Sequence, residues 1–408
     1  MTAHLSPAQA TASLGTREDP HRSLHSETGA LPGEHPGRAK NPLIKVAGLA
    51  WLEFEKPDLD RAERFCADFG FAVADRTPEM LLLRGRWAGP ACLVVRRGPQ
   101  SRFAGMAYMA AGREDLDRLA RGTGGTVTAH SGGHVVALRD PSGFPVRVVY
   151  GVPGFAALAE RAPLALNFGP GRERVNGTQR PVRGPAEIER LGHVVLGTTR
   201  FHAALDWYLD TLGLLVSDFL YLDGQRERGP AMAFIRCDQG SVPTDHHTLA
   251  MLLQPRTEYV HSAYQLTDLD EVAASGEYLR ERGYRHAWGI GRHIQGSQIF
   301  DYWRDRDRLM FEHYADGDAF DSSMEPGWAP LSVSGLAQWG PKATAEFTGA
   351  RDPGVAVAAI KALRDKGNEI DLAALRGLVK AMGSWAPTWP ALRTAGGWSH
   401  PPGSCASA

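Results

Sequence analysis

The sequence predicts an α+β fold in which a βαβββ module recurs along the chain, twice in each of two halves. Two long segments carry this prediction: GLAWLEFEKPDLDRAERFCADFGFAVAD (48–75) and RLGHVVLGTTRFHAALDWYLDTLGLLVSD (190–218). Each reads as a short alternating strand, a turn and an amphipathic helix that ends at a glycine, Gly70 or Gly213. Repetition of this unit indicates a duplicated sheet architecture.

The later elements of the two halves repeat in the same order. FAGMAYMAAGREDLDRLA (103–120) parallels VHSAYQLTDLDEVAA (260–274), and each predicts a strand followed by a helix with an acidic cap. VVALRDPSGFPVRVVY (135–150) parallels FDYWRDRDRLMFEHY (300–314), two strands joined by a charged turn. We therefore expect one domain over residues 43–152, a linker over 153–184 and a second domain over 185–320.

Both ends of the chain lie outside this repeat. Residues 1–42 are rich in Pro, Gly, Ser and Thr and poor in large apolar groups, so we expect a mobile or surface-draped arm. Its histidines, for which solvation is a simpler role than metal binding, are His4, His21, His25 and His35.

The C-terminal extension, residues 321–408, has apolar residues at helical spacing over 355–367 and 371–383. Asp371 is the expected cap of the second helix and Gly383 its expected end. We expect the two helices to pack on the core or on a neighbouring subunit.

Composition favours a protein that acts on small molecules. The 408 residues include 45 Lys and Arg against 46 Asp and Glu, so no overall field attracts nucleic acid or an anionic membrane. No segment resembles a signal peptide or a membrane span. The four cysteines are far apart in the sequence and lack the CxxC spacing of zinc ribbons. These features favour a cytoplasmic protein.

Three residues on separate predicted strands point to a metal site: His193 in LGHVVL, His261 in VHSAYQL and Glu312 in MFEHY. A single histidine on an apolar strand is usually a packed core residue, and a buried carboxylate is costly unless it is paired or bound to a metal. Together, two imidazoles and one carboxylate can occupy three facial positions of Fe(II) and leave the opposite face open for substrate and dioxygen.

The repeat provides an internal control for this interpretation. Alignment of the two halves places Ala50 opposite His193, Gly105 or a neighbour opposite His261, and Arg147 opposite Glu312. These residues do not form a metal-binding set, so we expect one metal site, in the second half of the chain.

The paired modules and these motifs resemble the vicinal oxygen chelate fold, and within it the two-domain type I extradiol dioxygenases, over about residues 43–320. The resemblance implies a sheet curled around a mononuclear Fe(II), with Mn(II) as an alternative. It also implies that the protein opens a catechol with O2 beside the diol, in aromatic compound catabolism.

The same resemblance assigns His247 in TDHHTLAM as an acid/base group and His293 and Tyr302 as groups that orient the substrate. His246 and His247 face opposite ways on a strand, and we choose His247 as the one in the metal cup. The spacing of ten residues between Tyr302 and Glu312 puts these two side chains on one face.

Further details depart from the family pattern or stay open. The turn DRDRL (305–309) and Asp301 differ from the residues usual there, and Val195 and Trp303 are equally suited to the pocket or the core. A 4-hydroxyphenylpyruvate-type dioxygenase and a small-molecule-binding protein of the bleomycin-resistance kind are the alternative functions. We expect a homo-oligomer; the sequence does not determine the ring substituent of the substrate or the number of subunits.

Overall fold

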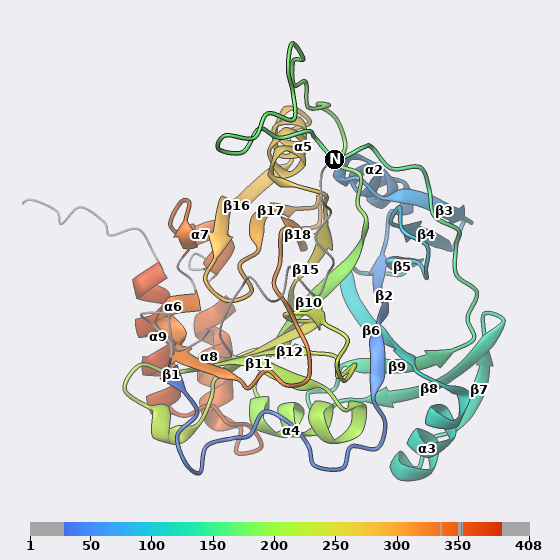
Figure 1. Ribbon diagram of the computed structural model, residues 1–408. Coiled ribbons are helices and arrows are strands. Elements are labelled where there is room, and N and C mark those ends of the chain that lie inside the picture. Colours follow the sequence, from blue (N-terminus) through green and yellow to red (C-terminus); the bar gives the residue numbers. More distant parts are fainter. Residues whose placement is uncertain (1–27, 335–336, 350–351, 353, 386–408) are drawn as a thin grey trace, which may run out of the picture.

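The computed structural model describes residues 28–334, 337–349, 352 and 354–385, and two large sheets dominate it (Figure 1). The N-terminal sheet has eight strands in the order β3-β4-β5-β2-β6-β9-β8-β7. Its elements are β2 (Val46–Lys56), α2 (Leu59–Phe69), β3 (Ala72–Arg76), β4 (Met80–Arg84), β5 (Leu93–Arg97), β6 (Arg102–Ala110), α3 (Arg113–Thr123), β7 (Val127–His130), β8 (Gly133–Arg139) and β9 (Pro145–Tyr150).

The C-terminal sheet repeats this topology. Its central strands have the order β11-β12-β14-β10-β15-β18-β17-β16, which matches the N-terminal order strand for strand. The elements are β10 (Arg190–Thr198), α4 (Phe201–Leu212), β11 (Leu215–Tyr221), β12 (Met232–Arg236), β14 (Leu249–Leu253), β15 (Glu258–Gln265), α5 (Leu269–Glu281), β16 (Arg285–His293), β17 (Ile299–Arg304) and β18 (Met310–Ala315). The predicted pairs of βαβββ modules are therefore present in both sheets.

Local capping explains where the helices begin and end. Gly70 and Gly213 end α2 and α4 in the left-handed conformation, with φ of 118° and 67°, as predicted. The side chain of Asp268 caps α5 by accepting a hydrogen bond from the backbone of Glu271. The acidic cap expected for α3 is wrong, because Gly112 occupies the cap and Asp115 reaches back to its backbone N–H.

The two sheets share one hydrophobic core. The ring of Phe54 on β2 lies 5.3 Å from that of Tyr259 on β15, and Phe69 at the end of α2 stacks on His313 of β18 at 3.8 Å. Lys56, almost fully buried, pairs with Asp305 and Asp307 in the β17–β18 turn. The charged turn that departs from the family pattern thus binds the N-terminal sheet.

Segments outside the repeat enlarge the C-terminal sheet. The arm is draped over the surface from residue 28: β1 (Thr28–Gly29) pairs with β20 (Gly327–Pro330), which pairs with β11. The remaining short elements are η2 (Arg226–Arg228), β13 (Thr244–Asp245), β19 (Ala319–Phe320), α6 (Leu331–Ser334), β21 (Ala337–Trp339) and α7 (Ala345–Thr348). His35 contacts Asp206 and Phe219, whereas His4, His21 and His25 lie outside the described residues.

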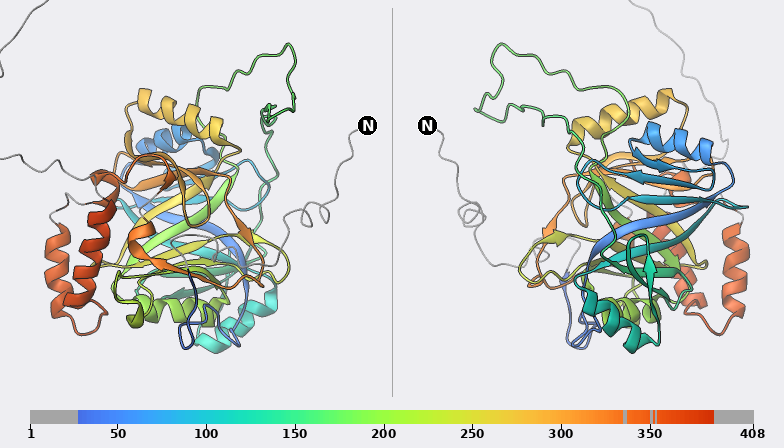
Figure 2. Two further views of the ribbon diagram at one scale, coloured as in Figure 1. Left: turned by 60° about the vertical axis from the view of Figure 1, so that its left-hand side comes forward. Right: turned by 90° about the vertical axis from the view of Figure 1, so that its right-hand side faces the viewer.

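Two C-terminal helices, α8 (Gly354–Arg364) and α9 (Leu372–Trp385), stand side by side against the C-terminal sheet, away from the N-terminal one (Figure 2). Asp371 accepts a hydrogen bond from the backbone of Ala374 and so caps α9, as predicted. The predicted end at Gly383 is wrong, because the helix continues to Trp385. Within the described residues, no helix combines the length and the apolar character that crossing a membrane requires.

Candidate active site

Three neighbouring strands of the C-terminal sheet, β10, β15 and β18, bring the predicted triad together. His193 is paired with Ala263, and Ala263 is paired with Glu312, so these residues form a row across the sheet on one face. His261 lies two residues before Ala263 and faces the same way. The small side chain of Ala263 leaves room between three larger ones.

The distances within this triad suit ligands of one ion. Nε2 of His193 and Nε2 of His261 lie 3.3 and 3.2 Å from Oε2 of Glu312. Two ligand atoms at right angles, each about 2.1 Å from a metal, lie roughly 3 Å apart. One candidate ligand atom from each residue falls within 4.8 Å of the others.

The polar atoms of the triad lack other partners. Both carboxylate oxygens of the fully buried Glu312 are without a hydrogen bond, as is Nδ1 of His193 and of His261. Burying a carboxylate removes its hydration, which costs roughly several kcal/mol unless a cation or hydrogen-bond donors compensate the charge. The residues present therefore fit a divalent cation.

The electrostatics favour the protonation states that metal binding requires. Burial lowers the pKa of His193, so its imidazole is neutral at pH 7 and offers a lone pair. Burial by itself would raise the pKa of Glu312, but the neighbouring imidazoles of His193, His261 and His293 hold it well below its ordinary value. The site therefore presents two histidines and a carboxylate anion.

His247, His293 and Tyr302 surround the open side of the triad. The ring of His247 lies 4.0 Å from that of His193, and Nε2 of His293 is 2.9 Å from the hydroxyl of Tyr302. Tyr302 is directly paired with Glu312 across β17 and β18, which confirms that the two share a face. Burial, together with the charge of Glu312, raises the pKa of Tyr302 well above its ordinary value, so its hydroxyl keeps its proton.

His246 and His247 lie in the connection between β13 and β14, not on a strand as predicted, and they face different ways. His247 lines the cavity beside the triad, whereas Nε2 of His246 contacts Oδ2 of Asp218 at 2.5 Å on the other side. The choice of His247 as the residue in the cup is therefore confirmed. His246 is still in contact with it, because the Nδ1 atoms of the two rings are 3.0 Å apart.

Val195 and Trp303, which the sequence left open between pocket and core, have different positions. Val195 lines the cavity, while Trp303 faces the core and donates its indole N–H to Asp301 at 2.7 Å. Asp301 also contacts His286 at 2.7 Å, so the unusual residue before Tyr302 belongs to a buried polar cluster behind the sheet.

A cavity of about 500 Å³ opens above the triad. His193, His261 and the three residues around them line one end of it. The remaining wall is mostly apolar and includes Trp288 of β16, Phe347 of α7 and the inner faces of α8 and α9. Sequence reasoning missed this role of the C-terminal helices, because a helical apolar pattern does not identify what the helix covers.

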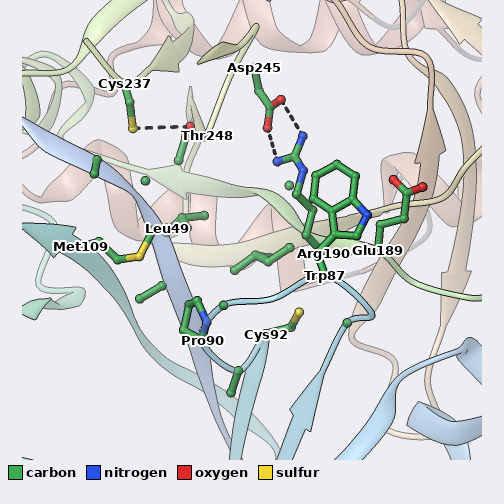
Figure 3. Close-up of a pocket in the computed structure, with 18 of the residues that line it drawn as sticks. Leu49, Trp87, Pro90, Cys92, Met109, Glu189, Arg190, Cys237, Asp245 and Thr248 are labelled. Atoms are coloured by element: carbon green, nitrogen blue, oxygen red, sulfur yellow. Dashed lines mark hydrogen bonds and ion pairs between the residues drawn. The ribbon is translucent and has the colours of Figure 1, made fainter. Parts of the chain in front are cut away.

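A second cavity, of about 330 Å³, lies between the two sheets and contains none of the triad residues (Figure 3). The guanidinium of Arg190 makes two hydrogen bonds to Asp245, at 2.5 and 2.7 Å, and lies over the ring of Trp87. Cys92 and Cys237 reach it from the N-terminal and C-terminal sheets respectively. Arg190 and Asp245 satisfy each other, and Glu189 accepts hydrogen bonds from Gln265 and Thr267 outside the cavity, so we assign it no chemistry.

The N-terminal sheet has the same strand order and pairing register as the C-terminal sheet, but different side chains at the positions of the triad. The strand register pairs Trp51 with Ala107 and Ala107 with Arg147, as His193, Ala263 and Glu312 are paired in the other sheet. The counterpart of His193 is therefore Trp51, and the alignment with Ala50 is wrong by one residue. Helix α4 has 12 residues and α2 has 11, so an alignment through the glycines that end these helices moves the preceding strands out of register by one residue.

Comparisons with known proteins agree with this geometry. Residues 190–313 match the Glyoxalase/Bleomycin resistance protein/Dioxygenase superfamily. Metapyrocatechase 2 of Cupriavidus necator is 30% identical over 334 residues, which cover 79% of this chain and 96% of that protein. An iron-dependent extradiol dioxygenase of Rhodococcus jostii (strain RHA1) is 23% identical over 73% of this chain and 97% of its own length.

Among solved structures, the Mn(II)-bound glyoxalase from Novosphingobium aromaticivorans has the same fold, with a TM-score of 0.57 and 22% identity over 73% of this chain and 93% of that one. The paired modules and the candidate metal triad are those of the vicinal oxygen chelate superfamily. Within that superfamily the chain belongs to the extradiol dioxygenases, oxidoreductases that incorporate both atoms of O2 into their substrate.

Proposed function

We propose that this chain binds one Fe(II), with Mn(II) as an alternative, through His193, His261 and Glu312, and opens the ring of a catechol beside its two hydroxyls. The observation that supports this most is the row of ligands on β10, β15 and β18, which faces a cavity lined by His247, His293 and Tyr302. A bound metal would hold the two catechol oxygens and O2 next to each other and mediate electron transfer between them.

The residues around the metal supply proton transfer and orientation. Burial, with the nearby His193 and His246, holds the pKa of His247 well below its ordinary value, so it is neutral at pH 7. A neutral imidazole can accept the second phenolic proton and later return it. The protonated hydroxyl of Tyr302 and the ring of His293 would donate hydrogen bonds to the substrate oxygens where negative charge develops.

The test is to purify the protein without oxygen, measure its iron content, and then add catechol and air. We expect close to one iron per chain and a yellow ring-opened product. Metal-loaded protein that binds catechol and yields no such product would contradict the proposal.

The alternative functions have less support in the site. A 4-hydroxyphenylpyruvate-type dioxygenase shares the triad, but His247, His293 and Tyr302 around it favour a diol substrate. In a binding protein without a metal, no cation would compensate the fully buried carboxylate of Glu312, which lacks hydrogen bonds. We further propose a cytoplasmic homo-oligomer, which fractionation and size-exclusion measurements of the native protein would test.

A further inference from the structure

The wall of the catalytic cavity opposite the metal end comes from the C-terminal extension. Val355 and Ala359 of α8 and Leu375, Leu378 and Met382 of α9 line it. All five side chains are apolar, and the helices are fixed in place by polar contacts at their junction. Glu369 accepts hydrogen bonds from the backbone and the ring of His202, at 2.9 and 2.8 Å.

The cavity is larger than a simple catechol needs. Its volume is about 500 Å³, whereas a cavity of roughly 150 Å³ is enough to hold a benzene ring. If the two hydroxyls face the triad, most of the remaining space lies toward α8 and α9. A substituent on the ring would fill this space and exchange water for apolar contacts, which stabilises the complex.

The charges around the cavity disfavour an acidic substituent. Among the described residues that line it, Arg256 is the only lysine or arginine. Its guanidinium is already paired with Asp352 at 2.7 Å and with Glu258 at 3.1 Å. One cation between two carboxylates leaves a net negative charge at this point, so a carboxylate on the substrate would meet repulsion and lose its hydration.

We propose that α8 and α9 make this chain selective for neutral catechols with a bulky apolar substituent, such as an alkyl chain or a second aromatic ring, over catechols with a carboxylate-bearing side chain. This inference rests on the proposed function, because it assumes that the diol binds at the triad. The C-terminal extension would thus determine which catechols the site accepts.

The first experiment compares catechol, propylcatechol, phenylcatechol and carboxyethylcatechol on metal-loaded wild-type protein, with the three substituted catechols tested in both positional isomers. Calorimetry without oxygen gives Kd, and product formation under oxygen gives kcat/KM. We expect Kd to fall about fourfold for each buried methylene. Carboxyethylcatechol should bind at least about tenfold more weakly than propylcatechol, in which a methyl group replaces the carboxylate. Equal affinities for all four, or tighter binding of the carboxylate, would overturn the inference.

A matched pair of variants tests the role of α8. Val355 lines the cavity, whereas Val357, two residues later, is 54% exposed and does not. Val355→Phe should weaken phenylcatechol binding by about tenfold or more relative to catechol binding, since added volume in the cavity wall excludes the larger ligand first. Val357→Phe should change neither. The inference fails if the two variants behave alike.

A second pair tests charge without disturbing the core. Val379 of α9 is 63% exposed at the edge of the cavity, and Leu372 is 59% exposed on the same helix and away from it. Val379→Arg should tighten carboxyethylcatechol relative to propylcatechol by up to about fivefold, the size of an exposed ion pair, and Leu372→Arg should not. No relative gain in Val379→Arg would count against the inference.

Ring opening of plain catechol reports separately on the proposed function. If the protein binds the apolar diols and does not open the ring of catechol, that result contradicts the proposed function alone.

Discussion

The two sheets of this protein share their strand order and pairing register, but they differ in the side chains of the row that holds the triad. In both, the middle member of a row across three strands is alanine: Ala263 between His193 and Glu312, and Ala107 between Trp51 and Arg147. The β-bulges also recur at the same places, beside the first residue of the row and again two residues further on. The same strand order and the same pairing register are therefore not sufficient to make a metal triad.

The N-terminal row is stabilised by its own polar contacts. Arg147 pairs with the buried Glu53 at 2.9 Å, and the indole N–H of Trp51 donates to the same carboxylate at 3.0 Å. At the counterpart of His261 stands Gly105, with φ of 138°, where an added Cβ would lie 2.7 Å from the carbonyl oxygen of Pro145. The first row thus differs from the second in its backbone as well as its side chains.

The largest expected effect is loss of the metal. We expect His193→Ala, His261→Ala or Glu312→Ala to abolish iron retention and ring opening while the fold persists, because each removes one of three ligands. Arg147→Ala, the matched change in the N-terminal row, should leave the iron content at one per chain. Elemental analysis and circular dichroism of the four variants decide this, and full iron occupancy in any ligand variant would remove that residue from the metal site.

His247→Asn or His247→Phe should leave iron bound and catechol chelated, and lower kcat by roughly a hundredfold or more, as for loss of a positioned proton-transfer group. His246→Phe should reduce turnover far less. It should instead lower stability by about 1–3 kcal/mol, because the buried carboxylate of Asp218 loses its contact with the His246 ring. Steady-state rates per bound iron separate the two residues. If the His246 variant loses turnover and the His247 variant keeps it, His246 would be the proton-transfer group.

Docking of the two sheets depends on Lys56. Lys56→Ala should lower the free energy of unfolding by roughly 3–5 kcal/mol, because Asp305 and Asp307 would keep buried charge without a cation. The adjacent surface pair of Glu55 and Arg102 provides the control, and Arg102→Ala should cost no more than about 1 kcal/mol. Denaturant unfolding measures both, and similar costs would show that the buried pair adds nothing to the docking.

Rebuilding the triad in the N-terminal row should fail. The triple variant Trp51→His, Gly105→His, Arg147→Glu should still bind one iron per chain and lose stability by about 1–3 kcal/mol, because histidine at position 105 is strained at positive φ. Iron titration gives the stoichiometry. A second iron bound with comparable affinity would show that side chains alone separate the two rows.

The smallest effect concerns the cavity between the sheets. Burial raises the pKa of Cys92 from its ordinary 9.0 to about 11, so the thiol stays protonated at pH 8 and should resist iodoacetamide until the protein unfolds. Above pH 9 the folded state then holds more protons than the unfolded state, so this group lowers stability as pH rises from about 9 to 11. Mass spectrometry of native and denatured samples checks the labelling, and rapid labelling of Cys92 in native protein would indicate that the sheets separate.

The sequence by itself determined the repeat, the ligand types and the faces of the strands. Side chains alternate along a strand, so local order was enough to put Tyr302 on the same face as Glu312. The choice of His247 over His246 came from the resemblance of TDHHTLAM to the family pattern, and the structure places His247 at the cavity. Comparison of the two repeated halves was enough to predict the metal site in the second half, because Arg147, the counterpart of Glu312, cannot act as a carboxylate ligand.

Tertiary structure decided what local order cannot encode. The counterpart of His193 is Trp51 rather than Ala50, because α4 is one residue longer than α2 and only the strand pairing shows where the extra residue lies. The charged turn containing Asp305 acquired its role only when Lys56, far away in the sequence, packed against it. The apolar pattern of α8 and α9 required burial of one face of each helix, but only the folded chain made those faces the wall of the cavity that the triad opens into.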